Sequence, residues 1–257
     1  MVKEVLIFSD MDNMAGFVIG KWREFSGEAI KDRGYFTVAL SGGKTPAVLY
    51  QKITGEDLPW DKTHVFMVDE RFVPYGSRDN NYHMINRVLL RHVPIPAKNI
   101  HPIITSDSSP GASANKYEED IASFFRKRRM QVPEIDLILL GIGEDGHTAS
   151  LFPGTPALRE TRRLVFAVSP ENSEKKERIS LTLPVINNAR NVMFLAGGAG
   201  KAKIIRDVIE GGNRAMPAAL VKPDKGNLFF LLDKEAASLL TGNYKPKNCN
   251  QPQSTQR

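Results

Sequence analysis

Short apolar runs alternate with longer amphipathic segments along most of the chain. Six runs rich in branched residues have the length of buried strands: residues 5–8, 35–40, 65–68, 137–140, 192–196 and 228–232. Segments with helical spacing of apolar residues lie between them: residues 14–31, 46–53, 82–90, 112–128, 201–209 and 234–240. This alternation predicts an α/β fold in which helices cover both faces of a mostly parallel sheet.

One stretch departs from the alternation. Residues 164–168 and 179–183 are two strand-like runs separated by a charged loop, with no helical segment between them. We expect these runs to form a small antiparallel addition to the main sheet.

The chain reads as one domain followed by a tail. No shift in composition marks a linker before residue 241, so we expect a single domain over residues 1–241. Residues 242–257 are polar, contain two prolines and show no apolar periodicity. We therefore predict that this tail is disordered.

Composition excludes several classes of protein. Hydrophobic residues make up 41% of the chain and charged residues 25%, which is ordinary for a protein that buries a core. The single cysteine, Cys249, allows no internal disulfide, and no His/Cys cluster has the spacing of a zinc site. No apolar run approaches the about 18 residues needed to span a bilayer. We predict a cytoplasmic protein with no membrane segment, metal or cofactor.

The formal net charge of +6 is compatible with nucleic acid, an anionic membrane or a small anionic substrate. The densest basic run, residues 126–129, follows a segment with helical spacing. We interpret it as the solvated C-terminal end of a helix, where cations interact favourably with the helix dipole. Since no aromatic residues are interleaved with this run, we expect no nucleic-acid partner.

Ligands of open parallel sheets bind beyond the carboxyl ends of the strands, so the residues after each strand are the informative ones. The run at 35–40 is followed by a loop that consists of Ser41, Gly42, Gly43, Lys44 and Thr45. Its glycines let backbone N–H groups approach an anion, and the following helix adds partial positive charge. We predict a phosphate-binding loop; the alternative is a plain turn with Thr45 as the helix N-cap.

The run at 65–68 ends in Asp69, Glu70 and Arg71. Two carboxylates and a guanidinium are costly to desolvate unless they are paired. Arginine is suited to bidentate recognition of an oxygen anion, so Arg71 is a candidate substrate contact. A structural ion pair explains the same three residues, and this motif alone does not decide between the two.

The loop after residues 137–140 carries the strongest signal. Residues 141–153 begin with three glycines in six positions and present Asp145 and His147 together. A histidine is a suitable general base, and a carboxylate can fix its tautomer. We predict His147 as the base, with either Asp145 or Asp69 orienting its imidazole. The letters G-x-G-x-x-G fit residues 141–146, but the acidic pair and the histidine argue against a dinucleotide site.

A second glycine-rich strand end follows residues 192–196. Glycines at 197, 198 and 200 precede Lys201 and a predicted helix. Arg178, which precedes the run at 179–183, is placed to reach the same site. We predict a second anion-binding end; the alternative is a flexible turn with a solvated lysine.

Taken together, these loops resemble those of the family of glucosamine-6-phosphate isomerases and 6-phosphogluconolactonases. The similarity spans residues 5–240 and is carried by residues 41–46, 68–71, 141–153, 178–184 and 198–202. It implies a modified Rossmann-like fold, no metal requirement and hydrolysis of 6-phospho-D-glucono-1,5-lactone in the oxidative pentose phosphate pathway. The resemblance places the catalytic histidine on His147 and the substrate-facing arginine on Arg71. It places the phosphate contacts on residues 41–45, Arg178 and Lys201.

Two features favour the lactonase branch over the deaminase branch of the family. The deaminase pattern resembles G-x-D-G-H-I-A-F-N-E-P, whose glutamate supports the histidine, whereas residues 148–153 here read T-A-S-L-F-P. Deaminases also tend to carry tyrosine at the position of Arg71. In the other direction, Asn80 stands where lactonases commonly have serine, and Lys44 is less usual than a small polar residue, which leaves its role open.

The predicted reaction is direct attack of water on the lactone carbonyl, with His147 as base. Arg71 and loop N–H groups would stabilise the oxyanion. Ser150 lacks the G-x-S-x-G context of an acyl-serine route. The alternatives are an aminosugar-phosphate deaminase or isomerase and a non-enzymatic sugar-phosphate sensor. The expected partner is a small sugar-phosphate lactone, and we expect a monomer.

Overall fold

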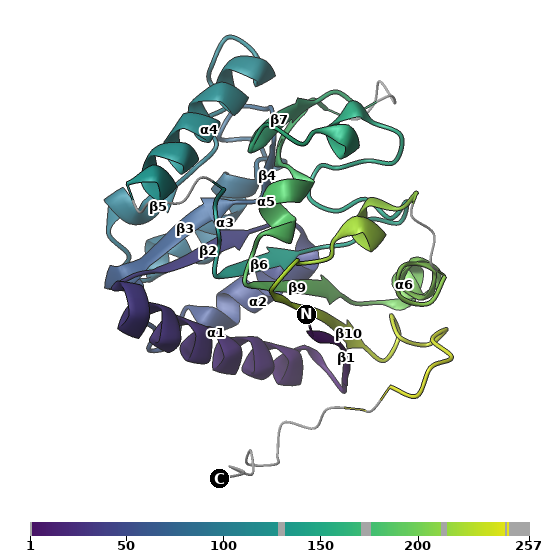
Figure 1. The fold of residues 1–257 in the computed structure, drawn as a ribbon. Helices are drawn as coiled ribbons and strands as arrows, with labels where there is room; N and C mark the ends of the chain where they lie inside the picture. The colour runs from purple at the N-terminus through teal and green to yellow at the C-terminus, as the bar shows by residue number, and fades with distance from the viewer. Residues whose placement is uncertain (1, 128–131, 171–175, 212–214, 245, 247–257) are drawn as a thin grey trace.

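A seven-stranded parallel sheet forms the centre of the protein in a computed structural model that describes residues 2–127, 132–170, 176–211, 215–244 and 246 (Figure 1). The strand order is β1-β10-β9-β6-β2-β3-β5. The strands are Val2–Phe8 (β1), Phe36–Leu40 (β2), Thr63–Met67 (β3), Ile100–His101 (β5), Leu137–Leu140 (β6), Asn191–Ala196 (β9) and Asn227–Asp233 (β10). The six predicted strands are confirmed, and the two-residue edge strand β5 is additional.

Every described residue of β2, β6 and β9 is buried. These strands lie in the middle of the sheet, where both faces are covered, which explains their continuous apolar sequence. Among the buried rings, Phe194 of β9 stacks on Phe230 of β10 with 5.0 Å between centroids.

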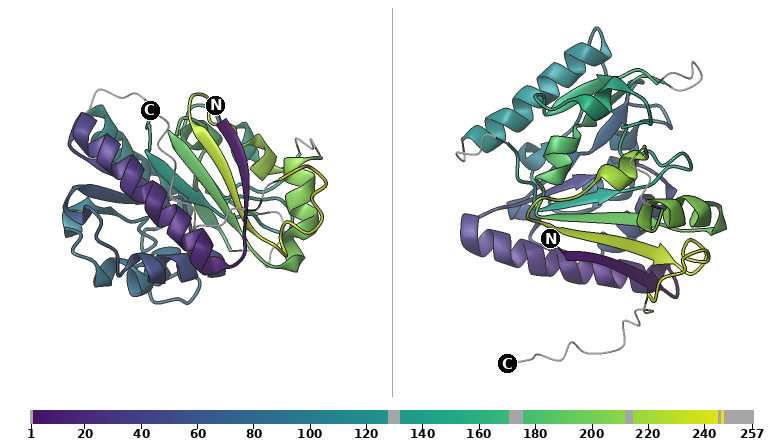
Figure 2. Two further views of the ribbon diagram at one scale, coloured as in Figure 1. Left: turned by 90° about the horizontal axis from the view of Figure 1, so that it is seen from below. Right: turned by 45° about the vertical axis from the view of Figure 1, so that its right-hand side comes forward.

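Helices cover both faces of the sheet, as predicted. They are Met11–Arg33 (α1), Lys44–Ile53 (α2), Asn81–Val88 (α3), Pro110–Arg126 (α4), Leu183–Asn187 (α5) and Ala202–Ile209 (α6). Helix α1 runs below the sheet and packs on α2, whereas α4 and α5 lie above it (Figures 1 and 2). The Asp10 side chain accepts a hydrogen bond from the Asn13 N–H, which fixes the start of α1 earlier than apolar spacing alone indicates.

A second sheet of three antiparallel strands lies above the first (Figure 2, right). It consists of Asp69–Arg71 (β4), Arg178–Leu181 (β8) and Val165–Val168 (β7), in the order β4-β8-β7. The predicted antiparallel addition is thus confirmed. However, Asp69, Glu70 and Arg71 form a strand of this second sheet, where the sequence indicated only the polar end of a strand.

The chain passes from one sheet to the other at Val68. Its N–H donates to the Leu40 carbonyl of the large sheet (3.0 Å), and its carbonyl accepts from the Leu181 N–H of the small sheet (2.9 Å). Strands β3 and β4 are therefore one nearly continuous extended segment that changes partners at this residue.

The helix predicted at residues 234–240 is wrong. The segment forms hydrogen-bonded turns, with a single bond of helical span, from the Ala237 N–H to the Asp233 carbonyl (3.1 Å). The Asp233 carboxylate accepts from the Ala236 N–H (2.7 Å), as in a helix N-cap, but the helical bonds are not continued beyond Ala237.

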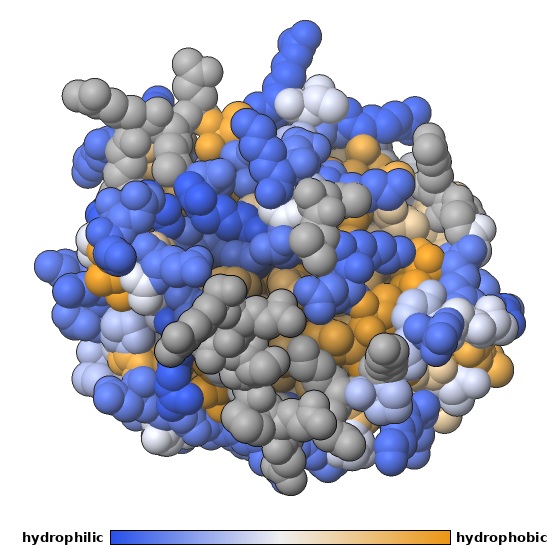
Figure 3. Space-filling view, turned by 60° about the horizontal axis from the view of Figure 1, so that its bottom comes forward, coloured by the Kyte–Doolittle hydropathy of each residue, from blue (hydrophilic) through white to orange (hydrophobic). Residues whose placement is uncertain are grey.

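Most of the predicted tail, including Cys249, lies outside the described residues. Its first residue still contacts the domain, because the Gly242 N–H donates to the Glu210 carboxylate (2.8 Å). Among the described residues, no helix is long and apolar enough to cross a membrane. The underside of the molecule is largely hydrophilic at its periphery, with apolar residues showing nearer its centre (Figure 3).

Candidate active site

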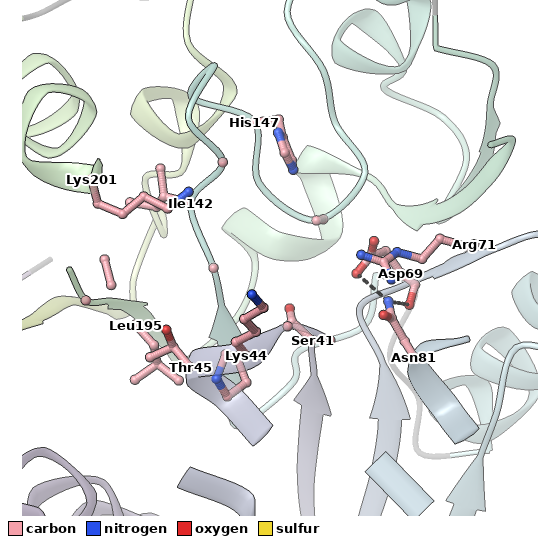
Figure 4. Close-up of a pocket in the computed structure, with 18 of the residues that line it drawn as sticks. Ser41, Lys44, Thr45, Asp69, Arg71, Asn81, Ile142, His147, Leu195 and Lys201 are labelled. Carbon is pink, nitrogen blue, oxygen red and sulfur yellow. Dashed lines mark hydrogen bonds between the residues drawn. The ribbon is translucent and has the colours of Figure 1, made fainter. Parts of the chain in front are cut away.

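A cavity of about 390 Å³ opens where the carboxyl ends of β2, β6 and β9 meet the small sheet (Figure 4). This is the edge at which ligands of parallel α/β sheets bind, and the volume suits a small molecule. Of all the predicted site residues, Asp145 alone does not line the cavity, and it contacts His147 instead. The strand-end predictions, made separately, therefore converge on one site.

The loop at the end of β2 presents a helix N-terminus to the cavity. Gly43 is the N-cap of α2 and has φ = +119°, a backbone conformation that favours glycine. The first N–H groups of α2, at Lys44 and Thr45, have no partner within the helix and are therefore open to an anion. Thr45 is not the N-cap, so the alternative of a plain turn capped by Thr45 is wrong.

Ser41 lies in the cavity wall, but its hydroxyl donates to the Leu139 carbonyl (2.8 Å). The Ser41 carbonyl accepts from the Tyr50 hydroxyl (2.8 Å). These bonds hold the end of β2 against β6 and α2. The Ser41 hydroxyl proton is therefore used in a hydrogen bond within the protein. Toward a ligand the hydroxyl can act only as an acceptor.

His147 is held by a short turn after β6. The Asp145 carboxylate bonds to Nδ1 of the imidazole and accepts from the His147 backbone N–H (3.1 Å). The Gly143 N–H donates to the His147 carbonyl (2.8 Å), which closes the turn. With Nδ1–H directed at Asp145, Nε2 carries the lone pair, and the ring points into the cavity (Figure 4).

Burial lowers the pKa of His147 below its ordinary value of 6.5, against the opposing influence of Asp145 and Asp69. The imidazole is therefore neutral at pH 7, the state that a general base requires.

Of the two carboxylates that the sequence left open as partners of His147, Asp145 makes the contact. Asp69 accepts instead from the Ser150 hydroxyl (2.6 Å) and, through its carbonyl, from the Asn81 amide (3.0 Å; Figure 4). Asp69 is nearly buried and lies in the cavity wall. It thus offers an oriented acceptor to a ligand rather than support to the imidazole.

Arg71 and Arg178 lie directly opposite each other on β4 and β8. Like charges at such positions destabilise a sheet unless an anion compensates them. Burial and the neighbouring Arg71 lower the pKa of Arg178. Among the described residues, the buried Nε of Arg71 has no hydrogen-bond partner, although its Nη1 donates to the Asp79 carbonyl (2.9 Å). The pair therefore favours a negatively charged ligand.

Lys44 and Lys201 line the cavity on the side opposite Arg71 (Figure 4). The glycine-rich loop before Lys201 differs from the expectation of a backbone anion site. The Gly198 N–H donates to Asp233 (2.8 Å), and the Ala199 N–H donates to Glu235 (3.2 Å). These two backbone N–H groups are therefore already bonded to carboxylates of the chain. The loop contributes the side chain of Lys201 to the cavity.

Several contacts were not predicted from the sequence. The Asn81 side chain packs so closely on Gly42 that a Cβ there would lie 1.9 Å from its Oδ1. Asn80, unusual by comparison with lactonases, is the N-cap of α3 and accepts from the His83 N–H (2.7 Å). Serine serves equally well at an N-cap, so this departure leaves the site intact.

Within the described residues, no group of three or more His, Cys, Asp or Glu side chains is arranged to hold a metal ion.

Glu70 is fully buried and supports the entrance of α3. Its carboxylate accepts from the backbone N–H groups of Arg71 (2.8 Å), Asn81 (2.7 Å) and Tyr82 (2.8 Å). Burial, only partly offset by these bonds, raises its pKa to about 7 from an ordinary 4.5. The side chain thereby ties β4 to α3 and places Asn81 in the cavity wall.

The free energy of unfolding should fall as pH rises from about 4.5 to 7, because the folded state holds the Glu70 proton more tightly than the unfolded chain does. Glu70→Gln cannot titrate, so the wild type should lose about 1–3 kcal/mol relative to this variant across that range. Urea unfolding at pH 5 and pH 7.5 measures the difference. Glu119→Gln, at an exposed position on α4, is the control. Parallel pH profiles of wild type and Glu70→Gln would contradict the raised pKa.

A parallel α/β sheet with a histidine–carboxylate pair among cations at its strand ends is the arrangement of an enzyme that acts on a small anionic substrate. Residues 9–230 match the family of glucosamine-6-phosphate isomerases/6-phosphogluconolactonase, and the chain belongs to this family. It is 43% identical over 215 residues to a 6-phosphogluconolactonase of Synechocystis sp., covering 83% of this chain and 88% of that protein. It is 34% identical over 246 residues to that of Mycobacterium tuberculosis, covering 93% and 99%.

Solved structures agree with this assignment. A 6-phosphogluconolactonase from Trypanosoma cruzi superposes with a TM-score of 0.82 at 31% identity, covering 94% of this chain and 99% of that one. The enzyme from Thermotoga maritima gives a TM-score of 0.76 at 30% identity, covering 90% and 99%. A monomeric glucosamine-6-phosphate deaminase of the NagB superfamily, at 19% identity and a TM-score of 0.74, shares the fold.

Proposed function

We propose that this chain hydrolyses 6-phospho-D-glucono-1,5-lactone to 6-phospho-D-gluconate, the second step of the oxidative pentose phosphate pathway. One observation carries the proposal: a neutral His147, bonded through Nδ1 to Asp145, points into a cavity lined by cations on two sides. The relatives named as 6-phosphogluconolactonases support the choice of substrate.

In the proposed reaction, a water molecule attacks C1 of the lactone while Nε2 of His147 takes its proton. The resulting imidazolium then gives this proton to the ring oxygen as the C1–O bond breaks. The carboxylic acid that forms loses a proton at neutral pH, so each turnover releases one proton. Arg71, which lines the cavity, stabilises the developing oxyanion in this proposal.

The phosphate is held by the N-terminus of α2 together with Arg178 and Lys201, all of which line the cavity. Binding the phosphate away from C1 orients the lactone toward His147. Lys44 adds charge on the same side of the cavity as Lys201 (Figure 4). Asp69, an oriented acceptor, is suited to a sugar hydroxyl.

Ser150 supports the direct attack of water. Its side chain is fully buried, and its hydroxyl donates to Asp69. It is therefore placed to orient a carboxylate rather than to form an acyl intermediate.

The test is proton release from freshly generated 6-phosphogluconolactone, with the spontaneous rate subtracted. Acceleration by the wild-type chain supports the proposal. No acceleration, accompanied by ammonia release from glucosamine 6-phosphate, would replace it with deamination.

The pH dependence of kcat/KM follows from the lowered pKa of His147. Since the base must be neutral, activity should be constant around pH 7 and fall only when pH drops below 6.5. Asp145→Asn removes the negative charge that raises this pKa, so the acid limb should move to still lower pH. The plateau should fall about tenfold because the tautomer is no longer fixed. Proton release measured from pH 5 to 8 gives both values, and a wild-type limb above pH 6.5 would contradict this role of His147.

A further inference from the structure

The ring of Phe152 contacts both His147 and Arg178. Its centroid is 4.6 Å from that of the His147 imidazole, with 38° between the planes. On Arg178, Cζ lies over the same ring at 5.5 Å from the centroid. Phe152 is nearly buried, with 4% of its surface exposed, and it does not line the cavity. It therefore touches two residues of the proposed site without reaching the ligand.

The backbone around Phe152 fixes where this ring lies. The chain reverses after His147 through Ala149, which has φ = +51°, a strained value for a residue other than glycine. The Leu151 N–H closes the reversal on the Thr148 carbonyl (2.9 Å). The Phe152 carbonyl then accepts from both the N–H (3.3 Å) and the hydroxyl (2.8 Å) of Thr155. The segment folds back so that its aromatic ring packs on the imidazole that precedes it.

We infer that Phe152 is a positioning residue that sets the separation between the catalytic base His147 and the phosphate contact Arg178. This inference rests on the proposed function. The lactone carbonyl and the phosphate lie at a fixed distance within the substrate, so base and phosphate contact must be spaced to match. Displacement of a reacting group by about 1 Å can cost about 100-fold in rate.

The ring has a second effect on the base. It covers one side of the imidazole and so contributes to the burial that lowers the pKa of His147. Loss of the ring should admit water to this side and raise the pKa toward 6.5. This consequence concerns the protein alone and requires no substrate.

Phe152→Leu tests the inference, since leucine keeps an apolar side chain but offers no ring to either neighbour. The matched control is Phe124→Leu. Phe124 is also nearly buried and lies 4.6 Å, centroid to centroid, from a histidine, His64, away from the cavity. We expect kcat/KM for the lactone to fall about 100-fold in Phe152→Leu, with kcat lowered and KM raised. Phe124→Leu should keep the wild-type kcat/KM.

The second readout is the NMR titration of the His147 Cε1–H signal, assigned by its loss in His147→Gln. Its pKa should rise in Phe152→Leu and stay at the wild-type value in Phe124→Leu. The inference would be overturned if Phe152→Leu had the same kcat/KM and the same His147 pKa as the wild type. Should Phe152→Leu fail to fold, Phe152→Met fills a similar volume and serves the same test. If the wild type does not hydrolyse the lactone, the proposed function fails, while the titration still decides the contact with His147.

Discussion

His147→Ala is expected to lower kcat/KM for 6-phosphogluconolactone by about 10²–10⁴-fold, the range that general-base catalysis contributes. The effect should fall on kcat, because the phosphate contacts at α2, Arg178 and Lys201 remain in place. The fold should be retained, since the His147 side chain is 29% exposed and belongs to a loop rather than to the core.

The measurement compares proton release by wild type and variant, with binding of 6-phosphogluconate followed by calorimetry. His92→Ala is the control, because His92 is an exposed histidine outside the cavity. If His147→Ala still binds 6-phosphogluconate but no longer hydrolyses the lactone, His147 is assigned as the general base. An active His147→Ala would keep the substrate but discard the mechanism.

Gly143→Ala is also expected to have a large effect, about a 100-fold loss of kcat/KM. The His147 ring lies directly over Gly143, and a Cβ there would be 2.0 Å from Nδ1 and 2.1 Å from Cε1. Atoms cannot approach so closely, so the imidazole must rotate away from Asp145. The added Cβ would also lie 2.8 Å from Asp145 Oδ1, so one methyl group should displace both members of the histidine–carboxylate pair.

Gly200→Ala is the control, because a Cβ at that loop position would meet no atom within 4 Å. The thermal midpoint of both variants should stay near that of the wild type. The NMR signal of His147 should move in Gly143→Ala only. Wild-type activity in Gly143→Ala would show that the imidazole does not need the place it occupies over this glycine.

The parallel sheet could be predicted because its central strands are buried on both faces and their sequences are continuously apolar. The location of the site followed from topology. Parallel strands bring their carboxyl ends to one edge, so the loops at residues 41–45 and 141–147 had to meet there. The glycines and His147 could be read directly from these loops, and Arg71 from the polar residues that follow the apolar run at 65–68.

Other features depend on contacts that no local pattern encodes. Strand β4 is short and polar, and it is a strand only because β8 pairs with it across more than 100 residues. No local pattern showed whether Asp145 or Asp69 contacts the His147 imidazole. In the structure Asp145 makes this contact, and Asp69 accepts a hydrogen bond from the Ser150 hydroxyl. The turns at 234–240 carry both helical spacing of apolar residues and an N-cap bond at Asp233, so their local pattern is that of a helix that the chain does not continue.

The passage of the chain from one sheet to the other at Val68 has a consequence for how such a protein can diverge. The two arginines belong to the small sheet, whereas the glycine loop and the histidine belong to strand ends of the large one. Substitutions in three short strands can therefore change which charges meet a ligand without disturbing the main architecture. The charges that the small sheet contributes can thus be remodelled while the glycine loop and the histidine turn of the large sheet are preserved.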